Sequence, residues 1–170
     1  SSPPPLPVKD IPDPAYLEET PEIQSKHGLL RGQARVITEK TSNAWEAALA
    51  INHWVHGYLD KVLVDSFTAL DAFHNRQGEC QSHTNLFIAL ARASGIPARV
   101  VNGLVYSKQY KGFLYHAWPE VYVGGWRALD PTFGQDAVDA THIKLSVGSH
   151  EGAIKLVEFL GQVGVELYEN

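Results

Sequence analysis

Hydrophobic positions in the first half of this chain recur at helical spacing. The spacing is loose in residues 21–36 and brief in residues 66–74. It is strongest in the segment that begins at Asn43, where Glu46 three residues later forms a capping-box-like start to a broad apolar face. Residues 84–94 carry another wide apolar face. The pattern therefore predicts a series of helices, of which the last is central and packed.

In the second half the apolar positions change to the alternation of strands, rich in Val, Tyr and Trp. Residues 98–106, 113–123 and 126–129 predict three antiparallel strands, with Gly124 and Gly125 as a two-residue hairpin loop. A strand, a helix and a last strand are expected in the tail, at residues 141–147, 151–160 and 163–168. Helices followed by strands predict an α+β domain and not alternating βαβ units.

Composition narrows the class of protein. Residues 1–14 hold six of the ten prolines and predict an extended linker or a strapped-down arm, which leaves residues 15–170 as one domain. The chain has 14 Lys and Arg against 19 Asp and Glu, and no run of basic residues is interleaved with aromatic residues. This composition argues against binding of nucleic acid or an anionic membrane. No apolar run approaches the roughly 20 residues of a membrane span. The chain contains no methionine, and its proline-rich start predicts a piece of a longer, multidomain protein.

Cys80 is the only cysteine, and it stands where the last predicted helix begins. A thiol at the first turn of a helix faces free backbone N–H groups and the positive end of the helix dipole, which favour the thiolate. One cysteine excludes an internal disulfide and any zinc site that needs two thiolates. A free cysteine is more often a small buried apolar residue than a nucleophile, so the interpretation depends on its partners.

A cysteine nucleophile needs a base, and the base needs a group that fixes its tautomer. His116 is the histidine inside a strand that the helix of Cys80 is expected to cover. Asp130 follows the next strand of the hairpin. Together the three residues predict a catalytic triad.

The hairpin register decides whether His116 and Asp130 can meet. A strict two-residue loop places Asp130 opposite Pro119, on the face away from His116. One extra residue returns both side chains to one face, and proline often marks such an irregularity. We therefore predict a bulge near Pro119; without it, Glu120 or Asp136 becomes the alternative partner.

Several other side chains have weaker claims to a functional role. His83 shares a helix face with Cys80, but Cys-x-x-His is at most half a metal site, so we expect His83 behind the catalytic pair or in the substrate cleft. Trp118 is expected to cover the catalytic pair or to pack in the core. No metal and no cofactor are predicted. Solvated surface is the expected environment of the remaining polar candidates, which are His53, His56, Asp136 and Asp139.

Four segments together carry a family resemblance, and they are Gly78-Glu79-Cys80-Gln81-Ser82-His83, the run 86–99, His116-Ala117-Trp118 and Trp126-Arg127-Ala128-Leu129-Asp130-Pro131-Thr132. In this order they closely resemble the bacterial transglutaminase-like domains of the papain-related superfamily. Residues 139–145 also resemble the tail of an uncharacterised bacterial subgroup. The resemblance implies a papain-like α+β fold whose nucleophile helix packs on an antiparallel sheet. It further implies Cys80 as nucleophile, His116 as base and Asp130 as its orienting group.

The family resemblance also implies an oxyanion hole, to which the backbone N–H of Cys80 contributes one donor. The family takes a second donor from a side chain before the cysteine, and the candidates here are Trp45, Trp54, Asn75 and Gln77. Calcium-dependent animal transglutaminases carry extra domains and acidic calcium sites, for which this chain has neither room nor a suitable loop. Peptide N-glycanases need a zinc site of paired cysteines, which one cysteine does not supply.

The predicted reaction is attack of the Cys80 thiolate on a carboxamide carbon of a peptide or protein, which forms a thioester. Water as second substrate makes the protein an amidase or peptidase, the outcome that the bacterial resemblance favours. An amine instead makes it a transglutaminase-type acyltransferase. A non-catalytic peptide-binding module is the alternative from another class, against which the intact triad argues. An extracytoplasmic location follows from the resemblance alone, and oligomeric state is not indicated.

Overall fold

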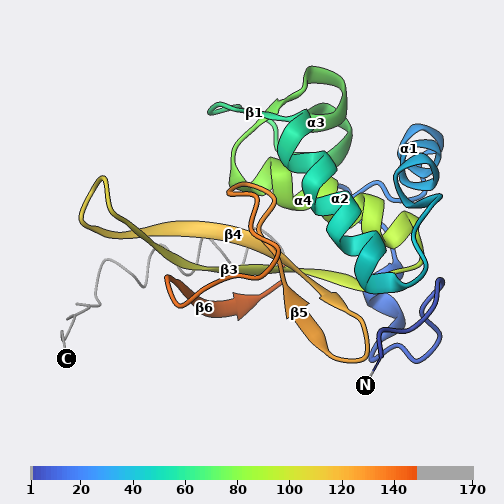
Figure 1. Cartoon of the computed structure of the whole chain (residues 1–170). Helices are drawn as coiled ribbons and strands as arrows, with labels where there is room; N and C mark the ends of the chain where they lie inside the picture. The colour runs from blue at the N-terminus through green and yellow to red at the C-terminus, as the bar shows by residue number, and fades with distance from the viewer. Residues whose placement is uncertain (1, 149–170) are drawn as a thin grey trace.

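A computed structural model describes residues 2–148, in which a group of helices lies against one antiparallel sheet (Figure 1). The helices are a short 3-10 turn η1 (Pro14–Leu17), α1 (Gly28–Thr38), α2 (Ala44–Tyr58), α3 (Ala69–Asn75) and α4 (Cys80–Ala93). The strands are β1 (Asp60–Lys61), β2 (Gln77–Gly78), β3 (Ala98–Ser107), β4 (Gly112–Tyr122), β5 (Trp126–Ala128) and β6 (His142–Val147). The predicted α+β class is confirmed, whereas the elements expected at 151–160 and 163–168 lie outside the described residues.

The helix starts show how local chemistry sets the boundaries. The side chain of Asn43 accepts the N–H groups of Trp45 and Glu46, so α2 begins where the capping pattern predicts. The predicted helix at 21–36 begins later, at Gly28. The reason is a tight turn in which Thr20 and Ile23 exchange backbone hydrogen bonds of 3.1 and 3.0 Å.

α4 is the central helix of the fold. It contacts α1, α2 and α3 on one side and strands β3 and β4 on the other. Its apolar residues, including Leu86, Phe87 and Leu90, are fully buried. Val100 of β3 and Val121 of β4 complete the same core from the sheet, because alternate residues of both strands face the helices. The predicted packing of the nucleophile helix on the sheet is thus confirmed.

The proline-rich start lies against this body of helices. The Ala44 N–H donates to the Pro4 carbonyl at 2.8 Å, and the Val8 N–H donates to the Gly95 carbonyl at 3.0 Å. Gly95 has a φ of +77°, and a Cβ there would lie 2.5 Å from the Pro7 ring. Only glycine therefore fits where the arm crosses the end of α4.

The sheet order is β5-β4-β3-β6, and its register corrects one prediction. β3 and β4 pair without interruption past Pro119, so the bulge predicted there is absent. The extra residue lies in the hairpin loop instead, because Tyr122 pairs with Trp126 and residues 123–125 form the turn. The three-residue loop shifts β5 by one position, and the Leu129 N–H continues the new register by donating to the Pro119 carbonyl at 3.2 Å.

Candidate active site

The first turn of α4 docks on a free backbone edge of β4. Since β5 ends at Ala128, the backbone of Ala117 has no strand beside it there. The Thr84 hydroxyl donates to the Ala117 carbonyl at 3.1 Å. One helical turn earlier, the Ala117 N–H lies near enough to the Cys80 sulfur to lower the pKa of the thiol. Two contacts to one residue therefore place Cys80 beside the strand that carries His116.

Gly78 permits this docking for a steric reason. A Cβ at this position would lie 2.2 Å from the Cβ of Ser82, which is fully buried. β2, which contains Gly78, also pairs in parallel with Asp60 and Lys61 of β1. The chain therefore enters α4 along a fixed path that leaves no room for a side chain immediately before Glu79 and Cys80.

His116 and Asp130 lie on one face of the sheet and are in direct contact. His116 Nε2 donates to Asp130 Oδ2 at 2.7 Å, and both side chains are buried. Asp130 Oδ1 accepts the backbone N–H groups of Thr132 and Phe133 at 2.8 and 3.1 Å. This arrangement directs the remaining ring nitrogen of His116, Nδ1, away from Asp130 and leaves it available as a base.

The carboxylate of Asp130 is stabilised in its charged form. Burial alone would raise the pKa of Asp130, but hydrogen bonds from His116 and from His142 outweigh it and hold the pKa below its ordinary value. His142, the first residue of β6, donates from Nε2 to the same Oδ2 at 3.0 Å. The sequence had not singled out His142, although it belongs to the 139–145 stretch that carries the subgroup resemblance.

The surroundings of Cys80 favour the thiol over the thiolate. Burial, followed by the nearby Glu79 carboxylate, raises the pKa of Cys80 to about 12. The Cys80 sulfur lies 3.5 Å from Glu79 Oε2, and within residues 2–148 its described hydrogen bonds include none to His116. Burial and a like charge therefore oppose the thiolate that the helix start alone favours.

The loop after Asp130 is held by a polar face of α2. His56 Nδ1 donates to the Pro131 carbonyl at 3.0 Å, and Asn52 Nδ2 donates to Asp136 Oδ1 at 3.2 Å. His53 Nε2 lies 2.6 Å from the same Asp136 oxygen. His53, His56 and Asp136 are exposed, so the prediction that they lie on solvated surface is confirmed. Their contacts with the segment that follows Asp130 were not predicted.

Trp118 and His83 are both placed behind the site. Trp118 is 2% exposed and stacks against His116 with ring centroids 5.9 Å apart. It therefore packs under the histidine, as one of the two predicted roles requires. His83 is fully buried and donates from Nδ1 to the Glu79 carbonyl at 2.9 Å, while its Nε2 has no hydrogen-bond partner within residues 2–148. Burial lowers the pKa of His83, so a neutral ring fits, and a place in the cleft does not.

The four candidates for a second oxyanion donor do not hydrogen-bond with Cys80 in the part of the chain that the structure describes. Two of them are committed to packing: the Arg127 guanidinium lies 4.9 Å from the ring of Trp45, and Trp54 stacks on Tyr58 with ring centroids 4.2 Å apart. The other two, Asn75 and Gln77, are exposed just before the nucleophile helix. The first-turn N–H of α4 remains the donor that the fold itself supplies.

A hydrogen-bonded network that the sequence did not indicate surrounds Tyr115. Gln81 Nε2 donates to the Tyr115 hydroxyl at 2.6 Å, and this hydroxyl donates to Asn102 Oδ1 at 2.8 Å. Burial, and then the negative charge that Cys80 carries when ionised, raises the pKa of Tyr115, so the hydroxyl stays neutral near the sulfur. Each of Gln81 and Tyr115 adjoins a candidate triad residue in the chain, which is the signal that could have identified them.

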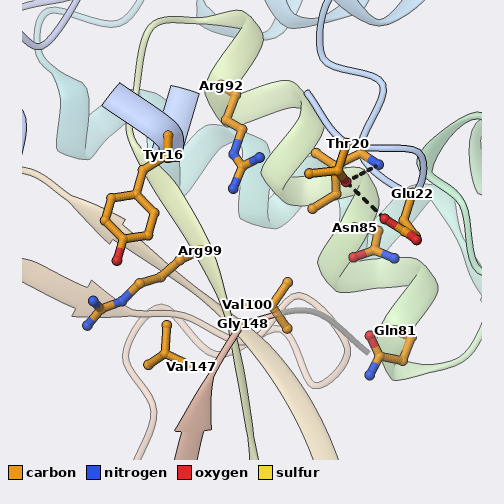
Figure 2. A pocket seen from close by; sticks show the side chains of 12 residues that line it. Tyr16, Thr20, Glu22, Gln81, Asn85, Arg92, Arg99, Val100, Val147 and Gly148 are labelled. Carbon is orange, nitrogen blue, oxygen red and sulfur yellow. Dashed lines mark hydrogen bonds between the residues drawn. The ribbon is translucent and has the colours of Figure 1, made fainter. Parts of the chain in front are cut away.

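Gln81 also lines a pocket of about 180 Å³ (Figure 2). Arg92 and Arg99 line it, yet both guanidinium groups already have partners. Arg92 donates to the Ala98 carbonyl at 2.8 Å, and Arg99 pairs with Glu120 at 2.8 Å. None of the triad candidates lines this pocket. It is therefore separate from the candidate active site, and its cations are not available for an anion.

A cysteine at the start of a central helix, docked on an antiparallel sheet that presents a buried His–Asp pair, defines a papain-like α+β fold. The sequence profile of the transglutaminase-like superfamily matches residues 31–131. The chain belongs to this superfamily, as the motifs around Cys80, His116 and Asp130 had predicted.

Comparisons with individual proteins agree with this assignment. The chain is 32% identical over 113 residues to an uncharacterised protein of Mycobacterium leprae, covering 61% of this chain and 39% of the relative. A solved structure from Cytophaga hutchinsonii, provisionally named a cysteine protease, matches with a TM-score of 0.72 at 28% identity, covering 85% of this chain and 50% of that one. The periplasmic domain of TgpA from Pseudomonas aeruginosa shares the fold, with a TM-score of 0.54 at 22% identity over 72% of this chain and 48% of that one.

The chain thus spans half or less of the length of each of these relatives. Among residues 2–148, no helix has the length and apolarity needed to cross a membrane.

Proposed function

We propose that the protein is a cysteine-dependent amide hydrolase, in which Cys80 is the nucleophile, His116 the base and Asp130 the group that orients His116. The observation that carries the proposal is the buried 2.7 Å hydrogen bond from His116 Nε2 to Asp130, on the strand against which the first turn of α4 docks. That bond fixes the tautomer in which His116 Nδ1 can accept a proton. The named relative from Cytophaga hutchinsonii supports the same class of activity.

The proposed reaction begins when the thiol turns from Glu79 toward His116. His116 Nδ1 takes the thiol proton while the sulfur attacks the amide carbon, and the first-turn N–H of Cys80 donates to the developing oxyanion. The C–N bond then breaks, and the same proton passes to the leaving amine. Catalytic hydrogen bonds in free enzymes are often long or poorly aligned and tighten when substrate binds, which is compatible with the contact of Cys80 with Glu79.

The resulting thioester can be resolved in two ways. Water, deprotonated by His116, gives a carboxylic acid and restores the thiol, which is the outcome we propose. A primary amine in the place of water gives acyl transfer, and acyl-enzyme formation is identical in both cases. We further propose that the substrate is a peptide or protein and that the chain is part of a longer protein. An extracytoplasmic location is also a proposal, since the likeness to the periplasmic TgpA domain is one of fold.

Mass spectrometry of a peptide and protein pool, incubated with and without a primary amine, tests the proposal. We expect new chain ends or loss of ammonia, without new amine adducts, and we expect neither change with Cys80→Ala. Amine-dependent adducts would assign acyl transfer instead. Identical product patterns from wild type and Cys80→Ala would support a non-catalytic binding module.

A further inference from the structure

Asp130 is shared by two buried imidazoles. Its Oδ2 atom accepts from His116 Nε2 at 2.7 Å and from His142 Nε2 at 3.0 Å, and the side chains of His142 and Asp130 are 1% and 0% exposed. A carboxylate that only orients one histidine needs one such donor. The proposed triad does not explain why His142 donates a second hydrogen bond to Asp130.

The other ring nitrogen of His142 faces hydrogen-bond acceptors. Nδ1 lies 3.3 Å from the Thr141 hydroxyl oxygen and 3.5 Å from Asp139 Oδ1. The single proton of the Thr141 hydroxyl is donated to Asp139, so both neighbours present lone pairs to Nδ1. A ring that donates from Nε2 to Asp130 and meets only acceptors at Nδ1 fits the doubly protonated, positively charged imidazolium.

The fold is shaped to bring His142 to this position. β6 pairs with β3, and the register shifts between Asn102 and Gly103. A Cβ on Gly103 would lie 2.1 Å from the Ile143 carbonyl oxygen and 2.7 Å from the Trp118 ring, so glycine is required for this approach. The ring of His142 then packs edge-on against Trp118, with centroids 5.1 Å apart and planes at 85°.

A metal site is the other arrangement that His116, Asp130 and His142 could form, since one ligand atom of each lies within 4.8 Å of the others. A metal would need both Nε2 atoms without protons. Both of these nitrogens instead lie at hydrogen-bond distance from one carboxylate oxygen, which requires a proton on each. The geometry therefore fits a hydrogen-bonded cluster better than a metal site.

We propose that His142 is a positioning residue that carries the positive charge balancing Asp130, so that His116 stays neutral and keeps Nδ1 free as the base. The positive charge of His142 neutralises the negative charge of Asp130, so His116 needs only the proton on its Nε2. The charged and titratable groups that face His142 are Asp130, Asp139 and His116, beside the aromatic rings of Trp118 and Phe133. This inference rests on the proposed function, because it assigns a role relative to His116 as base.

The test is the pH profile of Cys80 alkylation by iodoacetamide, followed by intact mass, which needs no substrate. In wild type the alkylation rate should rise through a limb near neutral pH, and the profile of His116→Ala should lack this limb. If the two profiles coincide, the proposed function fails. His142→Gln keeps an N–H for Asp130 but removes the charge, so His116 should hold its second proton more firmly and the limb should move up by about one pH unit or more. An unshifted limb that still depends on His116 would overturn the role of His142 alone.

Two further measurements keep the test decisive. His27→Gln serves as the matched control, because His27 is exposed and its side chain accepts from the Leu29 N–H at the start of α1, and it should leave the limb unmoved. In wild-type protein labelled with ¹⁵N-histidine, the His142 ring should carry protons on both nitrogens near neutral pH. A His142 ring with an unprotonated nitrogen would contradict the proposal even if the variant fails to fold.

Discussion

Replacing Glu79 with glutamine removes a carboxylate that contacts the proposed nucleophile, Cys80. The structure places Glu79 Oε2 3.5 Å from the Cys80 sulfur, where it opposes formation of the thiolate. Two unit charges at this distance repel by about 1 kcal/mol in water and about 5 kcal/mol at an effective dielectric constant of about 20. The pKa of Cys80 should therefore fall by about 1 to 3.5 units in Glu79→Gln.

The expected change in reactivity is smaller than the change in thiolate fraction. A thiolate of lower pKa is a weaker nucleophile, with a Brønsted coefficient of about 0.4 to 0.5, so alkylation near neutral pH should accelerate by about 3- to 120-fold. Because Cys80 is the single cysteine, the rate at which iodoacetamide adds mass to the intact chain reports this residue alone. The Glu39→Gln variant, which removes an exposed carboxylate after α1, is the matched control and should leave the rate unchanged. An unchanged or lower rate in Glu79→Gln would refute the electrostatic reasoning.

Four other substitutions test the site. Cys80→Ala should abolish amide cleavage, whereas Asp130→Asn should leave residual turnover because a cysteine is already a capable nucleophile; equal loss in steady-state assays would contradict this ranking. Gly78→Ala should lower the free energy of unfolding by about 1–3 kcal/mol, because the new Cβ would overlap Ser82, and the midpoint of urea unfolding should fall accordingly. An unchanged midpoint would show that the chain before α4 can adjust. His56→Ala should reduce kcat more than KM by loosening the loop after Asp130, and a change confined to KM would count against that role.

The parts of the fold that local chemistry determines were predicted from sequence. Asn43 caps α2 through contacts within three residues, and the long apolar face of α4 identifies it as the central helix. The hairpin register was not predictable in this way. A Gly-Gly pair permits both a two-residue and a three-residue loop, and the choice depends on Val123 joining the turn, where its N–H donates to Gly125 at 3.0 Å.

The supporting residues of the site escaped prediction because their partners are distant in the chain. His53 and His56, three positions apart on one helix face, have the pattern of a solvated stripe, and only the fold brings them to Asp136 and to the Pro131 carbonyl. His142 reaches the carboxylate of Asp130 through a register shift between β3 and β6 that no local pattern indicates. The raised pKa of Cys80 escaped prediction for the same reason, since burial depends on neighbours from several elements.

The central claim is that amide cleavage proceeds through a thioester on Cys80. Acid quenching of the protein during turnover of a cleaved peptide, followed by digestion and mass spectrometry, measures that intermediate directly. The account predicts an acyl adduct on the peptide that contains Cys80, absent in Cys80→Ala and strongly reduced in His116→Ala. Product formation without an adduct on Cys80, or an adduct that forms equally well without His116, would contradict it.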